Sequence, residues 1–224
     1  MITERYNALF QDEAQTKAIA KRILKEGCVV LPDFFDQATT DALYKYSRSL
    51  KDEERFTITR RSGTPAMNVA SSPEFMRVFE SIHKARCKIQ GTHHTPLDPT
   101  QQAVSLPIAS ASNTSDPVPF HFDDSFINAV LAIKMPPNSG DGNLLIYNNL
   151  RGRVRPLFLS KVVARLLRHL PGLRAIIRPK EISYQEGALH IFFGDLTLHG
   201  VRPFSAGERV TFTINASRVV RPPN

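Results

Sequence analysis

The first 50 residues combine apolar positions at helical spacing with one short apolar run. Within residues 12–25, apolar side chains recur at helical spacing, and Gly27 follows as a helix-ending residue. The run CVVLPDFF at residues 28–35 is typical of a short buried strand. Asp36 is placed to cap a second helix that follows this run. The pattern therefore predicts a helix, a strand and a helix in this order.

Two further segments complete the N-terminal part. The stretch FTITRRSGTPAMNV at residues 56–69 is strand-like in its composition. Beyond it, Ser72 and Pro73 predict the capped start of a third helix, because serine is a common cap and proline fits the first helical position. We expect these elements to form a helical support over about residues 1–95.

From about residue 100 the chain changes to short apolar segments separated by Pro, Gly, Asn and Asp. The segments of strand length are VPFHFDD, INAVLAIKM, NLLIYNN, EISY, GALHIFFG and RVTFTINAS. Residues 158–170 interrupt this series with a pattern that is typical of a helix. Short strands of this kind favour a β-sandwich or barrel with helices packed outside it, here over about residues 96–224.

Length and composition limit the class of protein. A chain of 224 residues can bury the core of one domain without a metal or a disulfide, so we expect a single domain over residues 1–224. Cys28 and Cys87 are too few for a disulfide framework. The sequence shows neither an apolar run of membrane-spanning length nor a signal-peptide pattern. These features predict a cytoplasmic protein without membrane contact, and they leave its oligomeric state open.

The net charge of +8 has a local origin. Residues 151–180 contain nine Lys or Arg and no acidic residue, whereas the rest of the chain holds 20 basic and 21 acidic residues. On the helix expected there, Lys161, Arg165 and Arg168 share one face. The apolar residues of the opposite face are Val163, Leu166, Leu167 and Leu170. We interpret this segment as a basic helical insert.

The charged face of this insert has two interpretations. It is either an ordinary solvated face or a surface for an anionic partner, such as a carrier protein or an anionic substrate. The solvated face is the ordinary interpretation, and the second is a hypothesis that rests on the slight cost of like charges four residues apart in a helix with no acidic residue nearby. Because the charge is confined to one segment, a nucleic-acid partner is the lesser option.

One strand-like segment carries unusual polar residues. PFHFDDSFINAV, at residues 119–130, places His121, Asp123 and Asp124 among apolar neighbours. Alternation along a strand puts His121 and Asp123 on the same side, whereas Asp124 points elsewhere or begins a turn. A histidine and an aspartate at this spacing are weak evidence alone, because the same pair arises by chance in many chains.

A second segment strengthens the metal hypothesis. In GDLTLHGVRPFSAGERVTFTI, His199 is followed ten residues later by Arg209, and Thr211 lies on the same strand face as this arginine. Two imidazoles and one carboxylate on one side of Fe(II) leave three adjacent positions open, as in facial-triad oxygenases. A buried arginine offers paired, planar donors to the far carboxylate of a keto acid, and a hydroxyl can complete the contact.

Together these residues resemble the Fe(II)/2-oxoglutarate-dependent dioxygenase superfamily, particularly its small bacterial and prolyl-hydroxylase-like members. The segments that carry the resemblance are ILKEGCVVLPDFFDQATTDAL, HFDD, GDGNLLIYNN and GDLTLHGVRPFSAGERVTF. It implies a mainly β fold, in which N-terminal helices flank a double-stranded β-helix (jelly roll) core. It also implies His121, Asp123 and His199 as metal ligands, with Arg209 and Thr211 binding the cosubstrate, and no catalytic side chain beyond the ligands.

The chain departs from these relatives at one position. Many of them have a cosubstrate-contacting tyrosine two residues before the first histidine, where this chain has Pro119. Tyr147 and Asn143 are the candidates for this contact. The implied cofactors are Fe(II), 2-oxoglutarate as cosubstrate and O2, with ascorbate as an addition in vitro.

The resemblance implies a hydroxylase of an unactivated C–H bond in a small molecule, with release of succinate and carbon dioxide. The substrate would be an amino acid or a natural-product intermediate, either free or bound to a carrier protein. Desaturation and ring closure are possible on the same iron. A protein side-chain hydroxylase of the prolyl type would use the same residues. A non-enzymatic jelly-roll binding module would not need Asp123 and Arg209 together.

Overall fold

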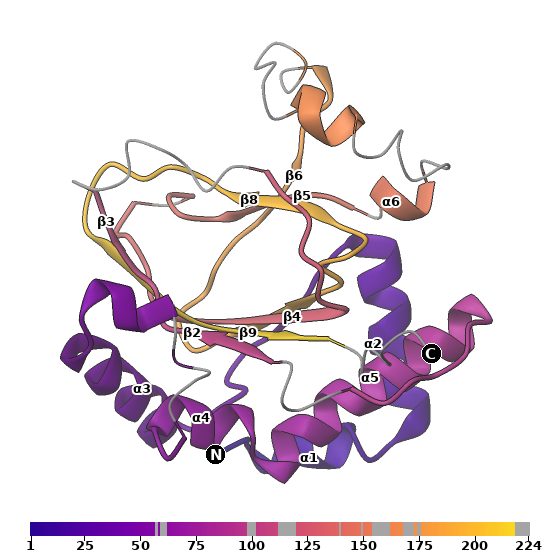
Figure 1. The fold of residues 1–224 in the computed structure, drawn as a ribbon, viewed down its shortest axis with the longest axis horizontal. Coiled ribbons are helices and arrows are strands. Elements are labelled where there is room, and N and C mark those ends of the chain that lie inside the picture. Colours follow the sequence, from indigo (N-terminus) through magenta and orange to yellow (C-terminus); the bar gives the residue numbers. More distant parts are fainter. Residues whose placement is uncertain are drawn as a thin grey trace, which may run out of the picture.

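The computed structural model gives the chain two antiparallel sheets that face each other (Figure 1). The described residues are 1–56, 58, 62–97, 102–111, 120–138, 140–148, 150–153, 162–167, 173 and 176–217. The strands are β1 (Val29–Leu31), β2 (Ala103–Ser105), β3 (Ile108–Ser110), β4 (Ile127–Lys134), β5 (Leu144–Tyr147), β6 (Lys180–Ile182), β7 (Leu189–Phe192), β8 (Leu198–Val201) and β9 (Glu208–Ala216).

The larger sheet has the strand order β1-β7-β4-β9-β2, and β3 also pairs with β9. The smaller sheet has the order β6-β5-β8. Strand β4 lies between β7 and β9, and Asn128 at its start is paired with Phe192 on one side and Asn215 on the other. The structure confirms the predicted mainly β fold, with a jelly-roll core and N-terminal helices.

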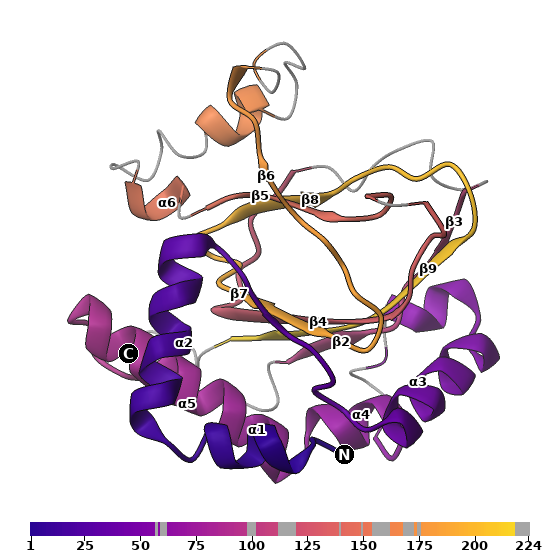
Figure 2. The same cartoon turned by 180° about the vertical axis from the view of Figure 1, so that it is seen from behind.

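The N-terminal helices cover the outer face of the larger sheet, as both views show (Figures 1 and 2). They are α1 (Glu4–Leu9), α2 (Glu13–Glu26), α3 (Gln37–Ser49), the 3-10 helix η1 (Asp52–Phe56), α4 (Pro65–Ala70) and α5 (Pro73–Gln90). No described helix has the length and apolar character that a membrane span requires.

Capping residues explain where the longer helices begin and end. The side chains of Asp12, Asp36 and Ser72 accept hydrogen bonds from backbone N–H groups in the first turns of α2, α3 and α5. Gly27 ends α2 in the left-handed conformation, with φ of 90°, where a glycine costs little. These caps confirm the helix boundaries that the sequence pattern predicts.

Three apolar clusters hold the layers together. The largest fills the space between the helices and the larger sheet, and Phe34, Phe75 and Phe212 are fully buried in it. A second cluster joins the two sheets through side chains such as Phe192 and Ile146. A third cluster lies on the other face of the smaller sheet and includes Tyr147. The space between the sheets is thus only partly filled by apolar side chains.

The strand-like stretch at residues 56–69 was predicted wrongly over its second half. Residues 65–70 form α4, and the Thr64 hydroxyl accepts a hydrogen bond from the Met67 N–H, 3.3 Å away. Pro65 sits in the first turn, where its missing N–H is not needed. The local cap therefore outweighs the β-branched composition of the stretch, whose Arg60 and Arg61 lie outside the described residues.

The basic segment is described only in part. α6 (Leu150–Arg153) begins it, and residues 162–167 are helical beside the smaller sheet (Figure 1). Leu167 is buried against this sheet as predicted, but Leu166 is 42% exposed, so it does not belong to the inward face. Lys161, Arg168 and Leu170 lie outside the described residues.

Candidate metal centre

Two histidines that are far apart in the sequence lie side by side. His121 precedes β4 of the larger sheet, and His199 lies in β8 of the smaller sheet. The N–H of His121 donates to the carbonyl of His199 at 2.9 Å, and the reverse bond measures 3.0 Å. This isolated backbone bridge brings the centres of the two imidazole rings to 4.4 Å. The pair is therefore positioned by backbone hydrogen bonds rather than by side-chain contacts alone.

Asp123 completes a three-residue cluster. One carboxylate oxygen lies 3.5 Å from Nε2 of His121, and the other lies 3.2 Å from Nε2 of His199. Burial raises the pKa of the Asp123 carboxyl, but hydrogen bonds and charge from the two imidazoles outweigh it and lower this pKa well below its usual range. The carboxylate is thus ionised at neutral pH, as a metal ligand must be.

The donor set fits a divalent transition metal. One ligand atom from each of His121, Asp123 and His199 lies within 4.8 Å of the others, and within the described part of the chain no other trio of this kind was found. Nδ1 of His199 lies 3.1 Å from the Thr197 carbonyl, so the proton of a neutral ring belongs on Nδ1 and Nε2 is free to bind a metal. Two imidazoles and one carboxylate are the ligand set of non-haem Fe(II).

Arg209 and Thr211 line the same cavity as the three residues of the cluster. The cavity has a volume of about 160 Å³, and residues of both sheets line it. The Nε atom of Arg209 and the hydroxyl of Thr211 are buried without a hydrogen-bond partner among the described residues. Buried polar atoms of this kind are costly unless a ligand satisfies them. The cavity therefore fits an anion with carboxylate chemistry.

Gly142 leaves space for the side chain of Arg209. Gly142 has φ of 71°, and a Cβ atom there would lie 3.2 Å from Cδ of Arg209. Glycine alone adopts this backbone conformation easily while leaving space for the arginine stem. The GDGN turn before β5 therefore reverses the chain and also leaves space for the side chain of Arg209.

No family model matches the chain, and no curated protein matches it in sequence. A prolyl 4-hydroxylase from Phytophthora capsici has a similar structure, with a TM-score of 0.60 and 16% identity, over 98% of this chain and 67% of that one. The alpha-ketoglutarate-dependent epimerase SnoN of nogalamycin biosynthesis gives a TM-score of 0.64 and 15% identity, over 92% and 84%.

A third similar structure is HygX from Streptomyces hygroscopicus with nickel and 2-oxoglutarate bound, with a TM-score of 0.56 and 10% identity, over 86% and 82% of the two chains. This chain has the fold of the 2-oxoglutarate–Fe(II) oxygenases. Within this oxygenase fold, the predicted residues His121, Asp123, His199, Arg209 and Thr211 all line one cavity.

Tyr147 lies outside the cavity that these residues line in the oxygenase fold. Alternation along β5 directs Leu144 and Ile146 toward the space between the sheets, and it directs Tyr147 to the opposite face. There the Tyr147 hydroxyl donates to the carbonyl of Ile177 at 2.9 Å. The prediction that Tyr147 contacts a cosubstrate does not agree with this placement.

Tyr184 lines the cavity instead. Its ring centre lies 4.9 Å from the guanidinium carbon of Arg209, and burial raises the pKa of its phenol, which the nearby Arg209 charge partly opposes. Asn143, the other candidate, holds the backbone of Tyr184, because its side-chain oxygen accepts a hydrogen bond from the Tyr184 N–H at 3.2 Å. The aromatic residue two positions after β6 was the signal in the sequence for this contact.

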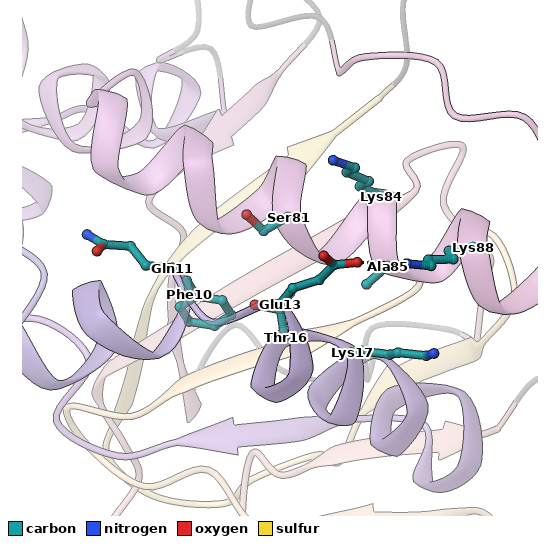
Figure 3. A pocket seen from close by; sticks show the side chains of 9 residues that line it. All are labelled: Phe10, Gln11, Glu13, Thr16, Lys17, Ser81, Lys84, Ala85 and Lys88. Carbon is teal, nitrogen blue, oxygen red and sulfur yellow. Dashed lines mark hydrogen bonds and ion pairs between the residues drawn. The ribbon is translucent and has the colours of Figure 1, made fainter.

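A second cavity lies on the helical side of the oxygenase fold. Side chains of α2 and α5 line much of it, and its Glu13 and Lys88 form an exposed ion pair at 2.8 Å (Figure 3). It shares no lining residue with the cavity of the His–Asp–His cluster. The His–Asp–His cluster, Arg209 and Thr211 therefore lie in a separate cavity, between the sheets.

Proposed function

We propose that residues 1–224 form a single-domain Fe(II)- and 2-oxoglutarate-dependent oxygenase that hydroxylates an unactivated C–H bond of a small molecule. The observation that carries this proposal is the shared cavity. A facial set of two imidazoles and one carboxylate opens into it, and the unpartnered polar atoms of Arg209 and Thr211 face the same space.

Each residue has a distinct role in this proposal. His121, Asp123 and His199 would hold Fe(II), and Arg209 with Thr211 would bind the distal carboxylate of 2-oxoglutarate. Tyr184 packs on the guanidinium group and limits its orientation. When bound, the iron, the cosubstrate and O2 supply the oxidising power, with release of succinate and carbon dioxide. The protein side chains orient these groups and exclude water.

The proposed substrate is an amino acid or a natural-product intermediate, free or carrier-bound. The similar structures include natural-product enzymes and prolyl hydroxylases, so a prolyl-type protein substrate is the alternative. A panel of free amino acids, carrier-bound acyl groups and proline-containing peptides, assayed for a mass increase of one oxygen, separates the two. Desaturation or ring closure would instead give a mass decrease of two hydrogens.

The oxygenase proposal has a direct test that needs no known substrate. The purified protein is loaded anaerobically with Fe(II) and then titrated with 2-oxoglutarate, and a weak visible charge-transfer band is expected only when both are present. On admission of air, with ascorbate to keep the iron reduced, slow succinate formation is expected. A protein that binds neither Fe(II) nor 2-oxoglutarate would contradict the proposal, and a non-enzymatic module would form no succinate.

An Arg209→Met variant tests the cosubstrate site. Removing one partner of a buried charge contact costs about 2–5 kcal/mol, so the KM for 2-oxoglutarate should rise on the order of 100-fold. Affinity for Fe(II) should stay unchanged, because Arg209 is not in the ligand cluster. Arg48→Met is the matched control, since Arg48 pairs with Glu208 beside Arg209 and is 53% exposed. An unchanged KM in Arg209→Met would remove this residue from the site.

We also propose that the basic segment at residues 151–180 receives an anionic partner, such as a carrier protein. Arg165 is exposed on the described helical stretch, while Leu167 of the same stretch packs inward. A Lys161→Glu, Arg165→Glu, Arg168→Glu triple variant should raise the KM for a carrier-bound or anionic substrate at least about tenfold at low salt. Its uncoupled succinate formation should not change. A triple variant with the parent KM would exclude this surface.

A further inference from the structure

We propose that Asn128 is a positioning residue that fixes the Asp123 carboxylate for metal binding. The inference rests on the proposed function in one respect, because it requires the His121–Asp123–His199 cluster to bind a divalent metal. It adds a residue that no ligand pattern in the sequence indicates.

Asn128 is buried next to the metal cluster. It is the second residue of β4, only 2% of its surface is exposed, and it lines the same cavity as the His–Asp–His cluster. Its side-chain N–H donates a hydrogen bond to the Asp123 carboxylate. A carboxylate only accepts, so the amide nitrogen, and not the amide oxygen, faces Asp123. The donor therefore points at the ligand by chemical necessity.

A second contact fixes the other end of the amide. The Ser125 hydroxyl donates to the Asn128 side-chain oxygen, so both polar ends of this amide are satisfied within the protein. Ser125 is itself buried, with 4% of its surface exposed. The three side chains form a chain from Ser125 through Asn128 to Asp123. An amide held at both ends has one orientation, which gives the carboxylate a fixed partner.

The backbone around Gly194 is adapted to this arrangement. A Cβ atom on Gly194 would lie 2.4 Å from the side-chain oxygen of Asn128, so a larger residue would displace the amide. The Gly194 carbonyl also accepts the Asp123 N–H at 3.2 Å. The next residue, Asp195, donates its N–H to the Ser125 carbonyl at 3.1 Å. The turn before β8 thus holds the Asp123 backbone and leaves space for Asn128.

The physical consequence concerns the free energy of metal binding. Without a fixed partner, the Asp123 carboxylate can rotate, and this freedom is lost when a metal binds. The Asn128 N–H removes part of this cost before the metal arrives. Losses of such outer hydrogen bonds typically weaken metal affinity by about 10–100-fold.

The test uses Asn128→Leu, which keeps the approximate size of the side chain and removes its donor. Mn(II) binding to the metal-free protein is followed by the loss of the free-ion EPR signal. The dissociation constant should rise about 10–100-fold relative to the parent protein. Asn148→Ala is the matched control, because the Asn148 amide donates to the Lys25 carbonyl at 2.6 Å, away from the metal cluster. Its Mn(II) affinity should be that of the parent.

Ser125→Ala gives a graded second variant, because it leaves the Asn128 donor in place and removes only the group that orients it. A neutral hydrogen bond of about 0.5–1.5 kcal/mol corresponds to a loss of about two- to tenfold in Mn(II) affinity. If Asn128→Leu does not fold by circular dichroism, Ser125→Ala decides the matter alone, and parent-like affinity in it overturns the inference.

The outcomes separate this inference from the proposed function. A parent protein that does not bind Mn(II) or Fe(II) defeats the proposed function and the inference together. A folded Asn128→Leu variant with parent-like Mn(II) affinity overturns the inference alone. If that variant keeps its Mn(II) affinity but has a raised KM for 2-oxoglutarate, Asn128 is a cosubstrate contact, and the positioning role is wrong.

Discussion

An Asp123→Ala variant should bind Fe(II) more than about 100-fold more weakly and form no measurable succinate, because loss of a direct ligand exceeds the 10–100-fold cost of losing an outer hydrogen bond. The carboxylate is the one anionic member of the cluster, so its removal leaves two neutral imidazoles to hold a divalent cation. The measurement is an anaerobic Fe(II) titration with a succinate assay of the same samples.

The neighbouring aspartate provides the matched control for this change. Asp124 is exposed and lies outside the metal cluster, so Asp124→Ala should keep the parent affinity and activity. The sequence alone offers the two carboxylates side by side, and this pair of variants separates them. Equal losses in both variants would show that the cluster does not bind the metal as proposed.

An Asp195→Ala variant should lower the free energy of unfolding by about 3–5 kcal/mol, because it leaves a buried guanidinium without its counter-ion. The side chain of Arg86 is 5% exposed, and its two terminal nitrogens lie 2.8 Å and 2.6 Å from the Asp195 carboxylate oxygens. Arg86 also donates to the Phe126 carbonyl at 3.0 Å and lies over the Phe193 ring. Urea denaturation of the metal-free protein measures the change.

Two comparisons show whether this loss comes from the unpaired charge. Replacing both partners, as Arg86→Met with Asp195→Leu, should recover much of the stability, because no buried charge is then left alone. Glu13→Ala breaks the exposed Lys88 pair seen in Figure 3, and it should leave the urea midpoint unchanged. If the double variant is no more stable than Asp195→Ala, the unpaired charge is not the cause.

The local elements and the pair His121 and Asp123 could be predicted from sequence because each depends on short-range signals. Asp12, Asp36 and Ser72 act as caps within three residues of themselves, and the segments of alternating residues give most of the strands. His121 and Asp123 are two positions apart, so a strand pattern predicts that they share one side. The structure has only an isolated bridge at His121 here, yet both residues line the same cavity. The fold class then follows from the number and length of the strands.

The remaining features depend on contacts between distant residues. Arg86 and Asp195 are 109 positions apart, and neither has a local pattern that indicates the other. The facing of Tyr147 depends on which side of β5 meets the larger sheet, and a shift of one residue would reverse it. Tyr184 meets Arg209 only in the folded chain, and the contact of Asn128 with Asp123 depends on the path of the chain between them. Sequence alone could therefore indicate the residues of the His–Asp–His cluster but not the groups around them.

The backbone bridge between His121 and His199 has a wider consequence for the molecule. His199 lies in β8 of the smaller sheet, and the segment that carries His121 continues into β4 of the larger sheet. An ion held by both imidazoles and by Asp123 would hold this segment against β8, so the position of the segment would depend on whether the metal centre is occupied. Local opening of this segment and loss of the metal would then be one coupled equilibrium.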